Sequence, residues 1–178
     1  MGGVWYKIYM ENPFGPQEEE TVDWYPDDST RKFVSQAIEQ LDTPRTILAT
    51  RPQVCKVPTD FACDILSLYV NSNLVLNILF TAPDHRRRGV ATMLLDWGLA
   101  TAKDLGLEFW LNATPIGKPL YEKHGFEVVQ KIVLAPKCHH PDEKWKRMEK
   151  EIGEVTFYTM WLPKEGLITE NTIRAWAG

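Results

Sequence analysis

The chain has 178 residues, a length that suits one domain with a single core. Hydrophobic residues make up 44% and charged residues 25%, the balance of an ordinary globular protein, which excludes a largely disordered chain, a collagen-like repeat and a coiled coil. The formal net charge of -4 argues against nucleic-acid binding, and no apolar run reaches the roughly 18 to 20 residues that a membrane span needs.

The cysteines and the N-terminus point to a reducing compartment. Cys55, Cys63 and Cys138 lie at unrelated spacings, which favours free thiols over a zinc site or a disulfide framework. Residues 138–140 read Cys-His-His, but adjacent side chains do not readily face one ion, so we predict no metal. The N-terminus carries no export signal or lipid anchor. These features predict a cytoplasmic protein.

The first predicted element is a strand at Val4–Tyr9, because β-branched and aromatic residues run there up to a turn. Residues 1–30 hold seven acidic side chains and one basic one, Lys7. The acidic stretch at 12–29 fits a solvated loop, and an acidic rim that attracts cationic substrates is the alternative.

A helix is predicted next, capped by Ser29 or Thr30 and ending before Pro44, because apolar residues recur at spacings of three and four. The chain then looks irregular as far as Thr59, although Thr46–Ala49 is compatible with a short strand. Residues 60–70 fit either a helical stripe or a strand, and the helix is favoured.

The pattern is clearer in the second half of the chain. A strand apolar on both faces at Leu74–Thr81, a helix covered on most sides at Gly89–Leu105 and a strand at Leu107–Leu111 predict a parallel β-α-β unit. The remaining predictions are a short helix at 118–124, strands at 126–134 and 154–161, a surface helix at 143–150 and a tail at 166–178.

The turn between the strand and the helix of this unit carries three consecutive arginines, Arg86–Arg88, followed by Gly89. A helix N-terminus offers unpaired N–H groups and partial positive charge, and glycine lets a ligand approach the backbone, so this turn suits a phosphate group. A solvated basic turn is the structural alternative.

Two motifs of the sequence resemble those of the GNAT superfamily of acetyl-CoA-dependent N-acyltransferases. Arg86–Ala91 matches the family pattern of Arg or Gln, two residues, Gly, one residue, and Gly or Ala. Leu120–Phe126 matches a second family motif as Leu-Tyr-Glu-Lys-His-Gly-Phe. The resemblance covers residues 74–134 and extends to 154–162. It implies an α/β fold in which helices flank a mixed, splayed β-sheet.

The resemblance also implies acetyl-CoA as co-substrate. Backbone amides from Arg86 to Ala91 would hold the coenzyme A pyrophosphate, and Arg87 or Arg88 would meet the 3′-phosphate unless they face solvent. The preceding strand end would hydrogen-bond the pantetheine arm, and Asn112 would either do the same or serve in a cap or turn. The expected cofactor-binding residues are Phe80, Thr81, Arg86, Arg87, Arg88, Gly89, Val90, Ala91, Thr92 and Asn112.

Tyr121 matches the family tyrosine that protonates the leaving thiolate, and a phenol with a pKa of about 10 can do so at neutral pH. A core tyrosine is the alternative. No general base is predicted: Val75 stands where some relatives place a glutamate, and Asn77 can at most hold a water molecule. His124 and His139 are possible proton acceptors by residue type alone.

These expectations add up to one domain over residues 1–165, with a divergent N-terminal part at 1–73. The usual first strand and two helices of the family are missing or replaced, so an exposed sheet edge and a homodimer are possible. The expected function is N-acetyltransfer to a small-molecule primary amine. The alternative is a non-catalytic acyl-CoA-binding or protein-interaction module.

Overall fold

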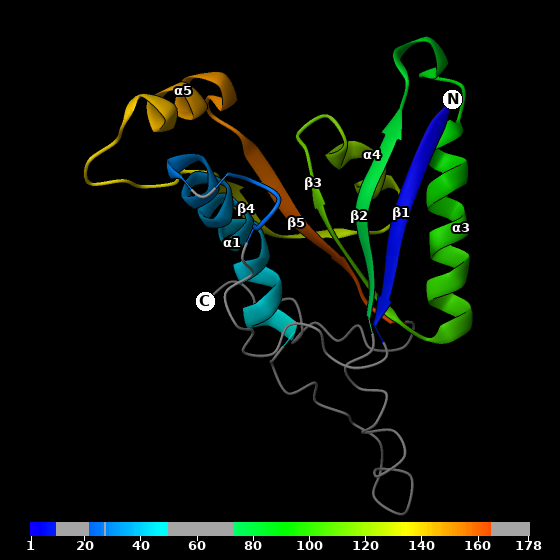
Figure 1. Ribbon diagram of the computed structural model, residues 1–178. Coiled ribbons are helices and arrows are strands. Elements are labelled where there is room, and N and C mark those ends of the chain that lie inside the picture. The colour runs from blue at the N-terminus through cyan, green and yellow to red at the C-terminus, as the bar shows by residue number, and fades with distance from the viewer. Residues whose placement is uncertain (10–21, 27, 50–72, 165–178) are drawn as a thin grey trace, which may run out of the picture.

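The computed structural model describes residues 1–9, 22–26, 28–49 and 73–164. In this part of the chain, one mixed sheet has the strand order β1-β2-β3-β5-β4 (Figure 1). Its strands are β1 (Gly2–Tyr9), β2 (Asn73–Thr81), β3 (Glu108–Ala113), β4 (Glu127–Val133) and β5 (Thr156–Leu162). The helices are α1 (Ser29–Ala49), the 3-10 helix η1 (Pro83–His85), α3 (Val90–Leu105), α4 (Lys118–Lys123) and α5 (Glu143–Ile152). The predicted α/β fold is confirmed.

The strand directions follow from the connections. β1 pairs with β2 antiparallel, β2 pairs with β3 parallel through α3, and β5 pairs antiparallel with both β3 and β4. The predicted parallel β-α-β unit is therefore present. α3 lies beside β1 and β2, whereas α1 packs on β4, β5 and α5 (Figure 1).

The two parallel strands separate halfway along their length. β2 pairs with β3 only from Asn73 to Leu76. At the same point β2 has a bulge against β1, where Leu76 faces Tyr6 and Ile78 faces Trp5, so that Asn77 is the additional residue. A bulge bends its strand and increases its twist. The sheet is consequently splayed beyond Leu76, as the resemblance implied.

The main core lies between the sheet and the helices α3 and α4. It is built from apolar side chains of both, and its buried members are Leu74, Leu76, Leu95, Ala102, Leu107, Phe109, Leu111, Ala113, Tyr121, Phe126 and Met160. On the other face, Trp110 and Trp161 both donate indole hydrogen bonds to the buried carboxylate of Glu108, over 3.3 and 3.2 Å. Burial on both faces is the main source of fold stability.

Three predictions about α1 were wrong. The helix continues through Pro44 to Ala49, so it does not end before the proline and Thr46–Ala49 is not a strand. Proline in a helix interior costs about 3 kcal/mol, but here α1 packs on β4, β5 and α5, and tertiary packing outweighs that cost. The cap is Asp28, whose carboxylate accepts the Thr30 amide at 2.8 Å.

The outer parts of two other elements are more exposed than predicted. β2 is buried from Asn73 to Leu76 but not beyond, because the splay leaves its second half without a partner strand on one edge in the described part. α3 exposes Met93 and Trp97 to solvent, so it is not covered on most sides. The predictions for residues 50–72 and 165–178, and for most of the acidic stretch at 12–29, fall outside the described residues. No described helix is long and apolar enough to cross a membrane.

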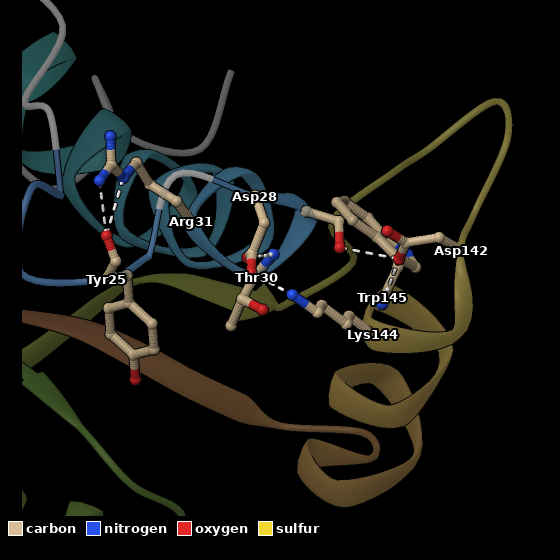
Figure 2. Close-up of polar contacts among 8 residues, drawn as sticks. Tyr25, Asp28, Thr30, Arg31, Asp142, Lys144 and Trp145 are labelled. Atoms are coloured by element: carbon tan, nitrogen blue, oxygen red, sulfur yellow. Dashed lines mark hydrogen bonds and ion pairs between the residues drawn. The ribbon is translucent and has the colours of Figure 1, made fainter.

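Polar contacts join the beginning of α1 to the beginning of α5 (Figure 2). Asp28 accepts an ion-paired hydrogen bond from Lys144 at 2.7 Å. Asp142 caps α5 through the Trp145 amide at 2.8 Å and also accepts the Ser29 hydroxyl. Beneath these contacts, Phe33 and Trp145 pack edge to face with ring centroids 4.9 Å apart. Each helix thereby supplies a partner for the other's capping carboxylate.

Acid is expected to weaken this contact between α1 and α5. Hydrogen bonds from Lys144 and then from Thr30 lower the pKa of Asp28 to about 2, whereas an unfolded aspartate has a pKa of about 3.9. Because the folded value is lower, the stabilisation is complete above about pH 4 and is lost as the pH falls toward 2. When the pH is lowered from about 4 to about 2, the melting temperature of Asp28→Asn should therefore fall less than that of the parent protein. Asp23→Asn is the control, and its melting temperature should fall with pH as that of the parent does. The same fall in Asp28→Asn as in the parent would contradict the role assigned to the Asp28 carboxylate.

Candidate active site

The loop between β2 and α3 presents a run of open backbone amides. The amides of His85 and Arg86 bond back to the carbonyls of Ala82 and Pro83, at 2.9 and 3.2 Å. From Arg87 to Thr92, by contrast, no backbone N–H has a hydrogen-bond acceptor among the described residues. These amides lie at the N-terminus of a 16-residue helix, where the backbone dipoles add partial positive charge.

The backbone conformation of this loop favours an anion. Arg87 and Gly89 both have left-handed conformations, with φ of 59° and 79°. Left-handed residues alternating with ordinary ones turn successive N–H groups toward a common side, which makes a concave anion site. A Cβ added at Gly89 would meet nothing within 4 Å, so the backbone there is open to a ligand.

The loop carries three exposed arginine side chains. Arg87 and Arg88 are exposed and make no hydrogen bond or ion pair with any described residue. The Nε of Arg86 donates to the carbonyl of Thr81 at 3.3 Å, which ties the loop to the end of β2. Guanidinium groups beside open amides are the donors that bind phosphate oxygens well. The loop therefore fits the pyrophosphate group implied by the resemblance.

The end of β2 offers a second set of unpaired groups. Beyond Leu76, the edge of β2 away from β1 has no partner strand in the described part of the chain. Phe80 and Thr81 lie on this splayed end, on opposite faces because side chains alternate along a strand. The Thr81 hydroxyl is buried and finds no hydrogen-bond partner among the described residues. An extended polar ligand would satisfy such an edge.

Tyr121 lies on α4 with its ring in the main core. The ring packs edge to face on Phe126 at a centroid distance of 5.9 Å. Burial raises the pKa of Tyr121 to about 12, so the phenol stays protonated at neutral pH. Its hydroxyl makes no hydrogen bond with any described residue, yet it is not one of the fully enclosed atoms, so it keeps contact with solvent. The Tyr121 proton is therefore not held in a hydrogen bond to any described residue.

The neighbouring Tyr6 differs in this respect. Burial, followed by the proximity of Tyr121, raises the pKa of Tyr6 to about 12 as well. However, the Tyr6 hydroxyl donates to the Leu94 carbonyl at 2.7 Å. A proton held in this internal hydrogen bond is not available to a substrate, so of these two core tyrosines Tyr121 is the better proton donor.

The structure uses the Asn112 side chain internally. Its amide nitrogen donates to the Leu41 carbonyl of α1 at 3.2 Å, and its oxygen accepts from the Thr159 hydroxyl at 3.0 Å. The side chain thus connects α1 to β3 and β5. For Asn112 to bind the pantetheine arm, one of these bonds would have to be exchanged.

No general base is evident among the two candidate histidines or the residues near the bulge in β2. His124 has Nδ1 2.7 Å from the Leu120 carbonyl and Nε2 3.4 Å from the Asp96 carboxylate, so both ring nitrogens are engaged. His139 is exposed in the segment before α5, Val75 is buried and Asn77 is exposed at the bulge. The described residues contain no group of three potential metal ligands of the His, Cys, Asp and Glu types.

Sequence reasoning missed one feature beside the splay. Trp5, Ile78 and Phe80 are exposed together on β1 and β2. The alternation of side chains along a strand puts Trp5 and Lys7 on one face of β1, a signal in the sequence that could have been used. What the sequence did not reveal was the bulge at Asn77, which brings Ile78 onto the same face as Trp5.

Comparisons with known proteins agree with this geometry. Residues 57–128 match the family model of the acetyltransferase (GNAT) domain. Among solved structures, the chain is similar to a mosquito arylalkylamine N-acetyltransferase-like 5b (TM-score 0.54, 14% identity, 90% of this chain and 67% of that chain). It is also similar to a Drosophila melanogaster polyamine N-acetyltransferase that forms N-acetylagmatine (TM-score 0.55, 13% identity, 91% and 68%).

An agmatine N-acetyltransferase gives a comparable match (TM-score 0.55, 15% identity, 90% of this chain and 69% of that chain). At these identities the likeness concerns the fold. A comparison with curated proteins finds no match. The family match and the fold together confirm the resemblance to the GNAT superfamily that the two motifs indicated.

Proposed function

We propose that this chain, whose residues 57–128 match the model of the acetyltransferase (GNAT) domain, transfers an acetyl group from acetyl-CoA to a primary amine of a small molecule. The observation that carries the proposal is the run of open amides from Arg87 to Thr92 at the splayed end of β2. Similar folds belong to proteins described as arylalkylamine, polyamine and agmatine N-acetyltransferases, which supports a small-molecule amine as acceptor.

Each part of the site has a role in this proposal. Acetyl-CoA supplies an acetyl group activated as a thioester. The amides of Arg87 to Thr92 would hold its pyrophosphate, with Arg88 beside them. The unpaired edge of β2 beyond Leu76 would align the pantetheine arm and polarise the carbonyl through backbone N–H groups. Tyr121 would hold a proton at its hydroxyl for the departing sulfur.

Replacing Tyr121 by phenylalanine tests the catalytic part of the proposal. The ring and its packing on Phe126 stay, and only the proton is lost. General acid catalysis contributes about 100-fold to 10,000-fold, so kcat for amine-dependent thiol release should fall at least about 100-fold. The KM for acetyl-CoA should change little, because the phenol acts on the departing sulfur rather than on binding.

Tyr158→Phe is the matched control for this experiment. Tyr158 is a partly buried tyrosine on the neighbouring β5, and its ring lies 5.3 Å from the Lys118 ammonium. We expect its kcat to stay within about twofold of the parent value. Equal losses of kcat in Tyr121→Phe and Tyr158→Phe would contradict a specific role for Tyr121. Acetyl-CoA binding without any amine-dependent thiol release would instead favour the non-catalytic acyl-CoA-binding module.

A further inference from the structure

Three exposed apolar side chains, Trp5, Ile78 and Phe80, form a strip on β1 and β2 that we call the apolar strip. They are 53%, 49% and 58% exposed. Trp5 stands opposite Ile78 in the strand register, and the Phe80 ring lies across Gly3, with its Cε1 2.7 Å from the position of a Gly3 Cβ. Single exposed apolar residues are common, whereas apolar side chains exposed next to one another are typical of binding surfaces.

The apolar strip lies on the face of the sheet away from α3. Tyr6 bonds to the Leu94 carbonyl and so faces α3, and alternation places the adjacent Trp5 on the opposite face. On that face α1 packs over β4 and β5 and reaches β3 through the contact of Leu41 with Asn112 (Figure 1). The point where β2 and β3 separate therefore lies between α1 and the apolar strip.

This position relates the apolar strip to the acceptor amine, on the basis of the proposed function. The open amides belong to the N-terminus of α3, so acetyl-CoA would approach from the α3 face. The opposite face of the separated strands is then left for the amine. Ile78 directly follows the bulge residue Asn77, at the point where β2 and β3 part. An amine bound there would lay the rest of its molecule against Ile78 and Trp5.

The charge beside the apolar strip narrows the class of amine. Lys7 is exposed, and its ammonium lies 5.6 Å from the centroid of the Trp5 ring. A positive charge at this place repels the second ammonium group of a diamine, whereas an uncharged aromatic or aliphatic group gains contact with the strip. We infer that the acceptor is a monoamine whose apolar part binds on Trp5 and Ile78, and not a polyamine.

Calorimetric titration of amines into the coenzyme A-saturated protein tests this inference, with a parallel titration into the free protein. The probes are 2-phenylethylamine and putrescine. The parent should bind 2-phenylethylamine at least about tenfold more tightly than putrescine. Trp5→Ala should weaken 2-phenylethylamine about tenfold and leave the Kd of coenzyme A unchanged, because Trp5 faces away from α3. Trp24→Ala, at a tryptophan that is 69% exposed outside the strip, should change neither.

Charge reversal at Lys7 gives an independent result. Lys7→Glu should tighten putrescine binding at least about fivefold and weaken 2-phenylethylamine by less than about twofold. Equal binding of the two amines, or equal effects of Trp5→Ala and Trp24→Ala, would overturn the inference. The titration records binding and not turnover, so a protein that binds 2-phenylethylamine through Trp5 but releases no thiol would contradict the proposed function alone.

Discussion

Gly89→Asp is expected to abolish the thermal stabilisation by acetyl-CoA, while the melting temperature of the free protein falls no further than in Gly89→Asn, which carries the same backbone strain. Nothing lies within 4 Å of the position of a Gly89 Cβ, and aspartate tolerates the left-handed φ of 79° better than most residues. A carboxylate near the pyrophosphate would repel it, and two unit charges 4 Å apart interact by about 4 kcal/mol near a protein surface. The Kd should therefore rise more than about 100-fold.

Gly89→Asn is the matched control, because asparagine has the same shape and tolerates the same backbone conformation without the charge. Excess acetyl-CoA at about 100 times its Kd should raise the melting temperature of the parent by several degrees, since it adds about 2.7 kcal/mol. The asparagine variant should keep most of this rise and the aspartate variant should show none. A full rise with Gly89→Asp would place the cofactor elsewhere.

Gly98→Ala is expected to destabilise the fold, although alanine is ordinarily better than glycine in a helix by about 1 kcal/mol. Gly98 is buried on α3 beneath the Tyr6 ring, and a Cβ there would lie 2.5 Å from the Tyr6 hydroxyl oxygen and 2.6 Å from its Cζ. Tyr6 cannot easily move aside, because it bonds to the Leu94 carbonyl and packs on Phe109. Overpacking of this kind costs about 1 to 3 kcal/mol, and for a chain of this length the melting temperature should fall by about 2 to 12 °C.

A double-mutant cycle with Tyr6→Leu tests whether the close approach to Tyr6 is what destabilises Gly98→Ala. Leucine lacks the atoms that a Gly98 Cβ would meet, so Gly98→Ala should become neutral or stabilising in the Tyr6→Leu background. Calorimetric or chemical unfolding of the four proteins gives the coupling. The same loss in both backgrounds would show that the contact with Tyr6 is not what excludes alanine at this position.

The parts of the structure that depend on neighbouring residues were predictable from the sequence. The β-α-β unit and the loop at Arg86–Gly89 follow from short-range patterns, since a strand, an open turn and a helix N-terminus are each encoded locally. The left-handed conformation of Arg87 was not predicted, because non-glycine residues rarely adopt it.

Other features depend on residues far apart in the chain. Helix α1 begins after Asp28, whose carboxylate is held by Lys144, and it passes Pro44 because it packs on β4, β5 and α5. The partners of Asn112 come from α1 and β5. The bulge at Asn77 is a property of the register with β1 and exposes the apolar strip. The cytoplasmic location, the division into 1–165 and a tail, and the homodimer stay predictions.

The most direct test of the proposed function is to identify the product. The full chain is incubated with acetyl-CoA and 2-phenylethylamine, and the amine product is followed by mass spectrometry while free thiol is measured in parallel. We predict one N-acetylated amine for each thiol released, at a rate that saturates in both substrates and collapses in Gly89→Asp. Thiol release without an acetylated amine, or no release with either 2-phenylethylamine or putrescine from a folded protein that binds acetyl-CoA, would contradict the assignment of this chain as an amine acetyltransferase.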